Sequence, residues 1–398
     1  MQQIAYLTQS APTKHLPQDL KTGEMLLNIG PQHPSTHGIL RLEVITDGEI
    51  VVDVVPHIGY LHRCFEKHAE ALPYNQIIPF VDRMDYLAAM NSEHAFAMGV
   101  EQMLGINGQL PTRVEYIRVL MAELNRLASH FMAIGTYGVD LGAFTGFLWL
   151  MRDREHILRL LEWASGARML YNYIWIGGLY YDLPVGFEER CQELVQHLRP
   201  QLTEIDTLIL ENKIFIQRTA NIGVLPMALA IDHSVSGPMV RASGLRFDLR
   251  RVDGYSVYPK LDFDIPIGEG LMGVLGDCWD RTWVRIQECK ESLKIVEQCL
   301  DRLTNDLKRT SGFNPQQLVP KKVRAPAQNL YVRAENPRGE LGFFFRAQKD
   351  SDKPFRCKVR TPSFANLSVL STMAKGHTIS NLIATLGSVD IVLGEVDR

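Results

Sequence analysis

The sequence predicts an α+β fold that is mainly α-helical, with a central helical bundle flanked by small antiparallel sheets. Apolar residues recur at helical spacing over long stretches between residues 111 and 308, whereas short stretches near both ends alternate as strands do. The 398 residues contain no internal repeat and no low-complexity linker. The sheets are therefore expected to flank one helical body instead of forming independent domains.

Residues 25–29, 39–45 and 49–55 are expected to form the first sheet, with a turn at Asp47 and Gly48. The loop between the first two strands, residues 30–38, reads Gly-Pro-Gln-His-Pro-Ser-Thr-His-Gly. Its internal proline and flanking glycines should keep this loop from becoming helix.

The clearest helix is expected between Pro111 and Gly135. Its apolar residues at helical spacing are Ile117, Leu120, Met121, Leu124, Leu127 and Phe131. Further helices are expected over residues 147–165, 187–210 and 278–308, and their lengths suit a bundle that holds most of the core.

The C-terminal part is expected to return to mixed structure. Residues 328–332, 340–346 and 355–359 alternate as a second small sheet, and residues 371–386 form a helix. The expected regions are an N-terminal extension, a β-rich region, a helical body and a C-terminal α/β region, over residues 1–24, 25–83, 84–320 and 321–398.

Composition excludes several classes of function. The 42 basic residues nearly balance the 45 acidic ones, for a net charge of -3, and no basic block suggests a nucleic-acid partner. Six cysteines without a C-x-x-C pair predict reduced thiols and argue against a metal held by paired cysteines. The first 24 residues lack the pattern of a signal peptide, and no apolar stretch approaches the roughly 20 residues of a membrane span.

The loop at residues 30–38 offers two imidazoles, His33 and His37. Their spacing of four would suit a zinc site on a helix, but Pro34 and the glycines deny the helix. Imidazole can donate a hydrogen bond to a carbonyl and supply a proton near neutral pH, as quinone reduction requires. The alternative is that one histidine simply braces the loop.

Two further polar groups could take part in chemistry. Asp85 is expected to cap a helix whose first turn contains Tyr86, a phenol able to donate to a quinone oxygen or to lie satisfied in the core. Asp140 stands among apolar and small residues between two helices, where it either caps a helix or finds a partner.

The remaining charges are ambiguous from sequence. Arg63 could be a fixed positive charge beside a cofactor or could pair with Glu66 on the surface. Glu123, Arg126 and His130 share one helix face, which is either an internal network or a solvated stripe.

Together these segments resemble the 49-kDa-type (D-type) subunit family of NADH:quinone oxidoreductase, respiratory complex I, over about residues 26–398. The motifs that support the resemblance occupy residues 30–38, 59–63, 82–86, 140–145, 165–169, 181–184 and 394–398. The resemblance implies that His37 and Tyr86 hydrogen-bond the quinone headgroup, with Asp140 holding His37. It also implies that the region of Val396 enters the same cavity.

The family is similar to the large subunits of [NiFe] hydrogenases, which implies a hydrogenase-like fold. Those proteins hold their metal with two C-x-x-C pairs, and this chain has neither, which disfavours a working hydrogenase. A second alternative, a non-catalytic assembly scaffold, is disfavoured because His37 and Tyr86 are both present. The resemblance therefore implies a quinone-reducing enzyme subunit, active in the complex, that binds no cofactor of its own.

The electrons would come from a four-iron-four-sulfur cluster held by the neighbouring small subunit, with Arg63 and Leu170 near that cluster. Many ubiquinone-using relatives carry histidine where this chain has Leu170. Loss of an ionisable donor should lower the cluster potential, so menaquinone is expected rather than ubiquinone.

The resemblance also implies partners and a location. The expected neighbours are the small cluster-binding subunit, the 30-kDa-type (C-type) subunit, the ferredoxin-like (I-type) subunit and the membrane-embedded (H-type) subunit. The chain would be a peripheral protein on the cytoplasmic side of the bacterial inner membrane, where quinone reduction drives proton pumping.

Overall fold

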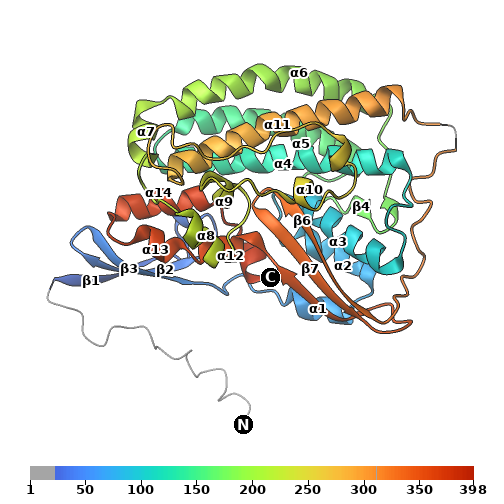
Figure 1. Ribbon diagram of the computed structural model, residues 1–398, viewed down its shortest axis with the longest axis horizontal. Coiled ribbons are helices and arrows are strands. Elements are labelled where there is room, and N and C mark those ends of the chain that lie inside the picture. Colours follow the sequence, from blue (N-terminus) through green and yellow to red (C-terminus); the bar gives the residue numbers. More distant parts are fainter. Residues whose placement is uncertain (1–22, 311) are drawn as a thin grey trace, which may run out of the picture.

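Four long helices form the body of the molecule. The computed structural model describes residues 23–310 and 312–398; the expected N-terminal extension, residues 1–24, lies almost wholly outside them. Figure 1 shows the long helices packed against one another as a bundle, with the two larger sheets below them. They are α4 (Thr112–Asp140), α5 (Phe144–Ser165), α6 (Phe187–Ile205), which continues as a π-helical turn over Asp206–Leu210, and α11 (Cys278–Asn305).

The helix predicted from Pro111 to Gly135 is longer than expected and runs to Asp140. Glycine weakens a helix interior by about 1 kcal/mol relative to alanine. Tertiary packing outweighs that cost here, because Tyr137 is buried just beyond Gly135 and meets Phe215 edge-on at 5.8 Å. Asp140 is therefore the last residue of α4 and does not lie in a loop between helices.

The first predicted sheet is present as β1 (Glu24–Ile29), β2 (Arg41–Asp47) and β3 (Ile50–His57), paired antiparallel in that order. The loop between β1 and β2 contains one turn of 3₁₀ helix, Pro34–Thr36, where no helix was expected. Proline suits this turn because it stands at the first helical position, where no intrahelical N–H is needed.

The second predicted sheet is β6 (Gln328–Asn336), β7 (Gly339–Ala347) and β8 (Pro354–Arg360), again antiparallel. Its apolar face packs on the N-terminal helices, with Phe96 in edge contact with Phe343 and Phe345. The three helices of this layer are α1 (Phe65–Ala71), α2 (Tyr74–Asp82) and α3 (Ala89–Leu104).

One predicted C-terminal helix is two. In place of a continuous helix over residues 371–386, α13 (Leu370–Ala374) and α14 (Ile379–Val389) flank a break. The backbone of the break pairs with the first sheet instead: Gly376 N–H donates to Val51 O at 2.9 Å and Ile379 N–H to Glu49 O at 3.1 Å. Bonds to a strand therefore replace the bonds of a helical turn.

Shorter elements complete the described chain, and the mainly α, α+β fold class is confirmed. In the part of the chain that the structure describes, none of the helices combines the length and apolar character needed to cross a bilayer. The shorter elements are β4 (Ile174–Trp175), β5 (Gly178–Leu179), α7 (Lys213–Thr219), α8 (Met227–Asp232), α9 (Pro238–Ala242), α10 (Leu249–Val252), η3 (Tyr258–Lys260), α12 (Pro362–Leu367) and α15 (Leu393–Asp397).

The tip of the β6–β7 hairpin is held against Gly237, which gives a test of the fold. Gly237 has φ 70° and ψ -149°, a region used almost only by glycine, and an added Cβ would lie 2.4 Å from Arg338 O. We expect Gly237→Ala to lower the free energy of unfolding by about 3 kcal/mol.

Gly105→Ala is the control, because Gly105 also has φ 70° but an added Cβ would meet no atom within 4 Å. It should cost about 1–2 kcal/mol, the strain of a left-handed residue alone. Thermal unfolding of the two variants, followed by circular dichroism, compares them. Equal destabilisation would show that the contact with the hairpin tip has no importance.

Candidate functional site

The loop before β2 holds His37 in a fixed conformation. Thr36 is buried, and its hydroxyl donates to two carbonyl groups, His33 O at 2.7 Å and Gly38 O at 2.8 Å. His37 follows in the left-handed region, with φ 51°. His33 is exposed and its Nδ1 accepts from Ser35 N–H at 3.3 Å. The two histidines thus differ: His33 caps the turn, and His37 points away from it.

His37 contacts Asp140 across 103 residues of sequence. The Nε2–H group of His37 donates to Asp140 Oδ2 at 2.6 Å, and both side chains are mostly buried. Burial opposes the charged imidazole, but the hydrogen bond and charge of Asp140, with the charge of Asp390, outweigh it and raise the pKa of His37. The pair can therefore hold a proton on His37 near neutral pH.

Close helix packing makes this contact possible. Gly387 of α14 faces the end of α4, where an added Cβ would lie 3.0 Å from Asp140 Oδ2. The N-cap of the following helix α5 is Ala143, so the carboxylate of Asp140 does not cap that helix. Of the two expectations for Asp140, a partner and a cap, the structure has the partner.

Tyr86 lies in the turn between α2 and α3 and is partly buried. Burial raises its pKa, as do the charges of Asp85 and Asp390, while those of Arg338 and Arg63 lower it. The hydroxyl therefore keeps its proton. Because Asp390 also acts on His37, one carboxylate lies within electrostatic reach of both groups.

The expectation that Asp85 caps a helix is wrong. Helix α3 begins at Ala89 and its N-cap is Ala88, which makes no side-chain cap. Asp85 is fully buried, and both of its oxygens accept from Arg338 Nη1, at 3.1 and 3.0 Å. The buried guanidinium competes for the carboxylate, because an unpaired charge in the interior is far more costly than an open helix end.

The C-terminal segment supplies two acids that sequence reasoning did not single out. Asp390 ends α14 and accepts from Arg338 Nη2 at 3.1 Å. Glu395 of α15 is 1% exposed and accepts from Ser363 N–H at 3.0 Å and from the Ser363 hydroxyl. The available signal was a charged residue inside an apolar run, as in Val389–Val392, which forces either exposure or pairing.

Burial, with the negative charge of Asp85, raises the pKa of Glu395 to about 8, although Arg338 and Ser363 act in the opposite direction. Glu395 is therefore mostly protonated at neutral pH. A proton stored on a buried carboxyl group near Asp85 is a chemical resource that the sequence alone did not reveal.

The other predicted site residues lie around this centre. Arg63 is exposed and its Nη2 donates to Arg83 O at 2.5 Å, while Glu66 pairs with Arg356 and Lys358, so the expected alternative pair with Arg63 is not formed. Val396 is 1% exposed and belongs to the apolar cluster under the first sheet.

Leu170 is partly buried in the loop after α5. That loop is tied to the segment before Tyr86, because Asn172 N–H donates to Asp82 Oδ2 at 2.9 Å. The structure thus connects the loop of Leu170 with the turn of Tyr86, although no direct contact joins the two residues among the described interactions.

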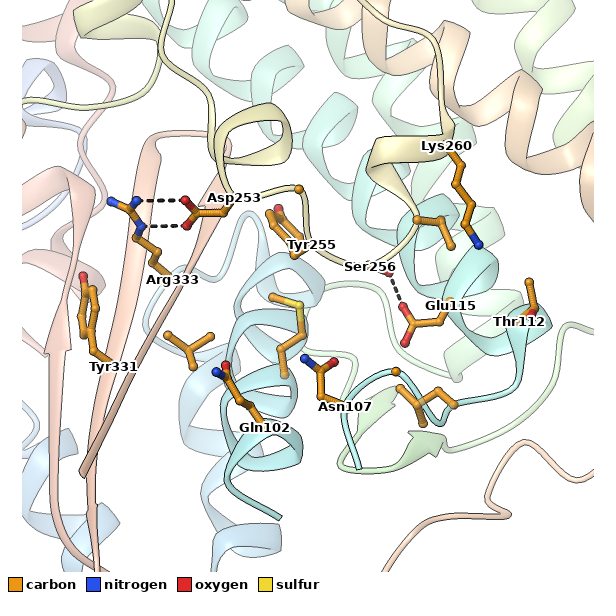
Figure 2. A pocket seen from close by; sticks show the side chains of 16 residues that line it. Gln102, Asn107, Thr112, Glu115, Asp253, Tyr255, Ser256, Lys260, Tyr331 and Arg333 are labelled. Atoms are coloured by element: carbon orange, nitrogen blue, oxygen red, sulfur yellow. Dashed lines mark hydrogen bonds and ion pairs between the residues drawn. The ribbon is translucent and has the colours of Figure 1, made fainter. Parts of the chain in front are cut away.

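A cavity of about 590 Å³ lies elsewhere, between the start of α4, the loop before η3 and strand β6. None of the predicted site residues lines it. Figure 2 shows that three of its charged groups have partners: Arg333 donates to Asp253 at 2.8 and 2.9 Å, and the Ser256 hydroxyl donates to Glu115.

Within the described residues, no group of His, Cys, Asp and Glu side chains is arranged to hold a metal ion. All six cysteines are free, and five of them are buried; Cys64 is exposed. No two of the six are paired, and that the thiols are reduced stays a prediction.

The raised pKa of Glu395 predicts a dependence of stability on pH. Folding raises the pKa of Glu395 from 4.5 to about 8. Below pH 4.5 the group is protonated in both the folded and the unfolded chain and leaves the free energy of unfolding unchanged. As the pH rises toward 8, the group ionises first in the unfolded chain, so the free energy of unfolding falls progressively. Glu395→Gln keeps the shape and the acceptor for Ser363 but cannot ionise.

We expect the melting temperature of Glu395→Gln to fall less than that of the parent between pH 5.5 and 8. Asp262→Asn is the control, since the side chain of Asp262 is 86% exposed and should leave the parent slope unchanged. Parallel pH profiles for Glu395→Gln and the parent would contradict a protonated Glu395.

Comparison with known proteins identifies the family of the chain. Residues 140–398 match the family model described as respiratory-chain NADH dehydrogenase, 49 Kd subunit. The chain is 77% identical to the D-type subunit of the NADH-quinone oxidoreductase of Amoebophilus asiaticus, covering 98% of this chain and 96% of that protein. It is 70% identical to a D-type subunit (D 1) of Cytophaga hutchinsonii (96% and 97% covered) and 57% identical to the D-type subunit of Chlorobaculum tepidum (96% and 94%). The chain therefore belongs to the 49-kDa subunit family of respiratory-chain NADH dehydrogenase and is a subunit of that oxidoreductase.

Proposed function

We propose that this chain forms the quinone-reduction site of a proton-pumping NADH:quinone oxidoreductase. The observation that carries the proposal is the contact of 2.6 Å between His37 Nε2 and Asp140 Oδ2. It leaves an imidazole with a raised pKa near the surface, and Asp390 links it electrostatically to Tyr86. The names of the relatives supply the substrate class, a quinone.

Quinone reduction consumes two protons at the two ring oxygens. His37, protonated and held by Asp140, can donate to one oxygen, and the Tyr86 hydroxyl can donate to the other. As His37 loses its proton, Asp140 continues to accept from the Nε2–H group and so keeps the ring in orientation. The site thus supplies protons and orientation, while Val396 supports the apolar wall behind it.

The electrons would be supplied by a four-iron-four-sulfur cluster in the adjacent small subunit, close to Arg63 and Leu170. Arg63 fits this position because its exposed guanidinium can attract a reduced, more negative centre. Leu170 offers that centre no hydrogen bond and no charge. A cluster without such a donor has a lower potential, which favours menaquinone as the acceptor.

The remaining proposals concern the assembly. The chain would contact the small cluster-binding subunit, the 30-kDa-type subunit, the ferredoxin-like subunit and the membrane-embedded H-type subunit. It would lie peripherally on the cytoplasmic side of the inner membrane. Movement of charge at His37 and Asp140 would be transmitted to proton translocation in the membrane part.

Removal of one hydroxyl tests the proposed site. We expect Tyr86→Phe to lower inhibitor-sensitive quinone reductase activity of the assembled complex on the order of 100-fold, because a positioned acid contributes about that much. His37→Ala should have a similar effect. The measurement is turnover with a soluble quinone, normalised to assembled complex.

Tyr173→Phe is the matched control. The Tyr173 hydroxyl is buried and has no hydrogen-bond partner among the described residues, so its loss should leave turnover unchanged. Full turnover in assembled Tyr86→Phe and His37→Ala complexes would refute the assignment of the site.

The quinone preference has its own test at Leu170. In the parent complex the cluster should have a low midpoint potential that hardly depends on pH. Leu170→His should raise the midpoint and give a slope approaching about 59 mV per pH unit, the value for one proton per electron. A redox titration followed by electron paramagnetic resonance, with Leu170→Met as control, measures both. A high and steeply pH-dependent midpoint in the parent would overturn the menaquinone assignment.

A further inference from the structure

A buried arginine stands between the two halves of the proposed quinone site. Arg338 lies in the turn between β6 and β7, yet its side chain is 1% exposed. Hairpin turns usually face water, so a charged side chain directed inward from one needs partners that offset its lost hydration. The tip is fixed in place, since Asn366 Nδ2 donates to Arg338 O at 3.1 Å.

The guanidinium is bonded on all three nitrogens. Nη1 donates to both oxygens of Asp85 and, at 3.0 Å, to the hydroxyl of Ser129 in α4. Nη2 donates to Asp390 Oδ1 at 3.1 Å, and Nε donates to Asp390 O at 3.1 Å. Arg338 therefore holds the turn before α3 and the end of α14 at once.

Two of these partners are acids that act on the proposed quinone-binding groups. Asp85 is the neighbour of Tyr86 in the chain, and its charge acts on the Tyr86 hydroxyl. Asp390 acts on both Tyr86 and His37. Arg338 thus contacts two acids whose positions and charges influence how readily the two groups give up protons.

We propose that Arg338 is a positioning residue for quinone reduction. It holds the Tyr86 turn and the Asp390 end of α14 in one arrangement and balances the negative charge between the two quinone-binding groups. This inference rests on the proposed function and adds to it a residue that does not touch the quinone.

The charge of Arg338 also favours the reaction directly. It lowers the pKa of Tyr86, against the effects of burial and of the two acids. Transfer of the hydroxyl proton to a quinone oxygen leaves a phenolate, which a fixed positive charge stabilises. A proton from solvent then restores the phenol, so Arg338 itself neither gains nor loses a proton.

Several other charged or titratable groups face this cluster and belong to the same balance. Arg285 of α11 approaches Asp390 Oδ2 with its Nε at 3.9 Å. Glu395 of α15 faces Asp85 and Arg338, Arg63 faces Tyr86, and Asp140 of α4 faces His37. Removal of Arg338 leaves the acids in excess, whereas removal of Asp390 leaves the arginines in excess.

Opposite charge changes give the experiment, made in the assembled complex with a soluble quinone. Arg338→Gln should lower kcat by on the order of 10-fold or more, leave KM within about twofold, and move the pH profile of kcat to higher pH. Unopposed Asp85 and Asp390 would raise the pKa of Tyr86 and His37. Asp390→Asn should move the profile to lower pH. Arg338→Lys retains the positive charge, so its pH profile should lie close to that of the parent even if its kcat stays lower.

Arg118→Lys is the control for the loss of a buried guanidinium that bonds to both oxygens of a carboxylate. Arg118 is fully buried and donates to both oxygens of Glu101, at 2.6 and 3.0 Å, in a separate part of the body. This variant should keep the parent pH profile whatever it does to stability.

Each outcome supports or overturns the inference. Shifts of the pH profile in opposite directions for Arg338→Gln and Asp390→Asn support it. If the Arg338→Gln complex does not assemble, the profiles of Asp390→Asn and Arg338→Lys are compared with the parent instead. The proposal is overturned if the pH profiles of the variants are unchanged or all shift in one direction. It is also overturned if none of the three variants assembles, because Arg338 would then have a structural role alone. Tyr86→Phe in the same preparation separates the questions: if it retains full turnover, the proposed quinone site itself is wrong.

Discussion

The positive charge of Arg338 is a constraint on the whole fold, because a buried guanidinium must be matched by acceptors at short range. Its acceptors come from residues 85, 129 and 390, in three segments far apart in the sequence. Satisfying them brings together the turn before α3, the middle of α4, the end of α14 and the tip of the β6–β7 hairpin. The meeting of sheet and bundle is thus specified by polar contacts as well as by apolar packing.

The same rule governs the interior of the helical body. Glu123 of α4 is fully buried and accepts from Arg250, from the Tyr258 hydroxyl at 2.7 Å and from the Ser292 hydroxyl at 2.7 Å. Ion pairs in place of apolar residues add little net stability, but removal of one member costs about 3–5 kcal/mol. Such a core tolerates few alternative arrangements, which suits a subunit that must present side chains at fixed distances.

Sequence patterns predicted this molecule well wherever the signal was local. Helical spacing located the four long helices, and alternation located the strands of both larger sheets. The stripe of Glu123, Arg126 and His130 was ambiguous because spacing shows that residues share a face and not what covers it. In the structure all three side chains are buried, and Glu288 of α11 pairs with His130 at 3.1 Å. That partner is 158 residues away, beyond any periodicity.

At the site, too, short sequence patterns indicated single residues, whereas contacts between distant segments depend on the tertiary fold. Motif resemblance selected His37, Tyr86 and Asp140 and implied that Asp140 holds His37, but the geometry of that contact depends on how α4 and α14 pack, which no short pattern contains. The turn Asn-Pro-Arg-Gly at residues 336–339 would predict an exposed arginine, and it is the tertiary fold that buries Arg338. Arg338 bonds to both Asp85 and Asp390, and the charge of Asp390 acts on His37 as well as on Tyr86. A change at Asp390 should therefore alter the proton affinities of both groups.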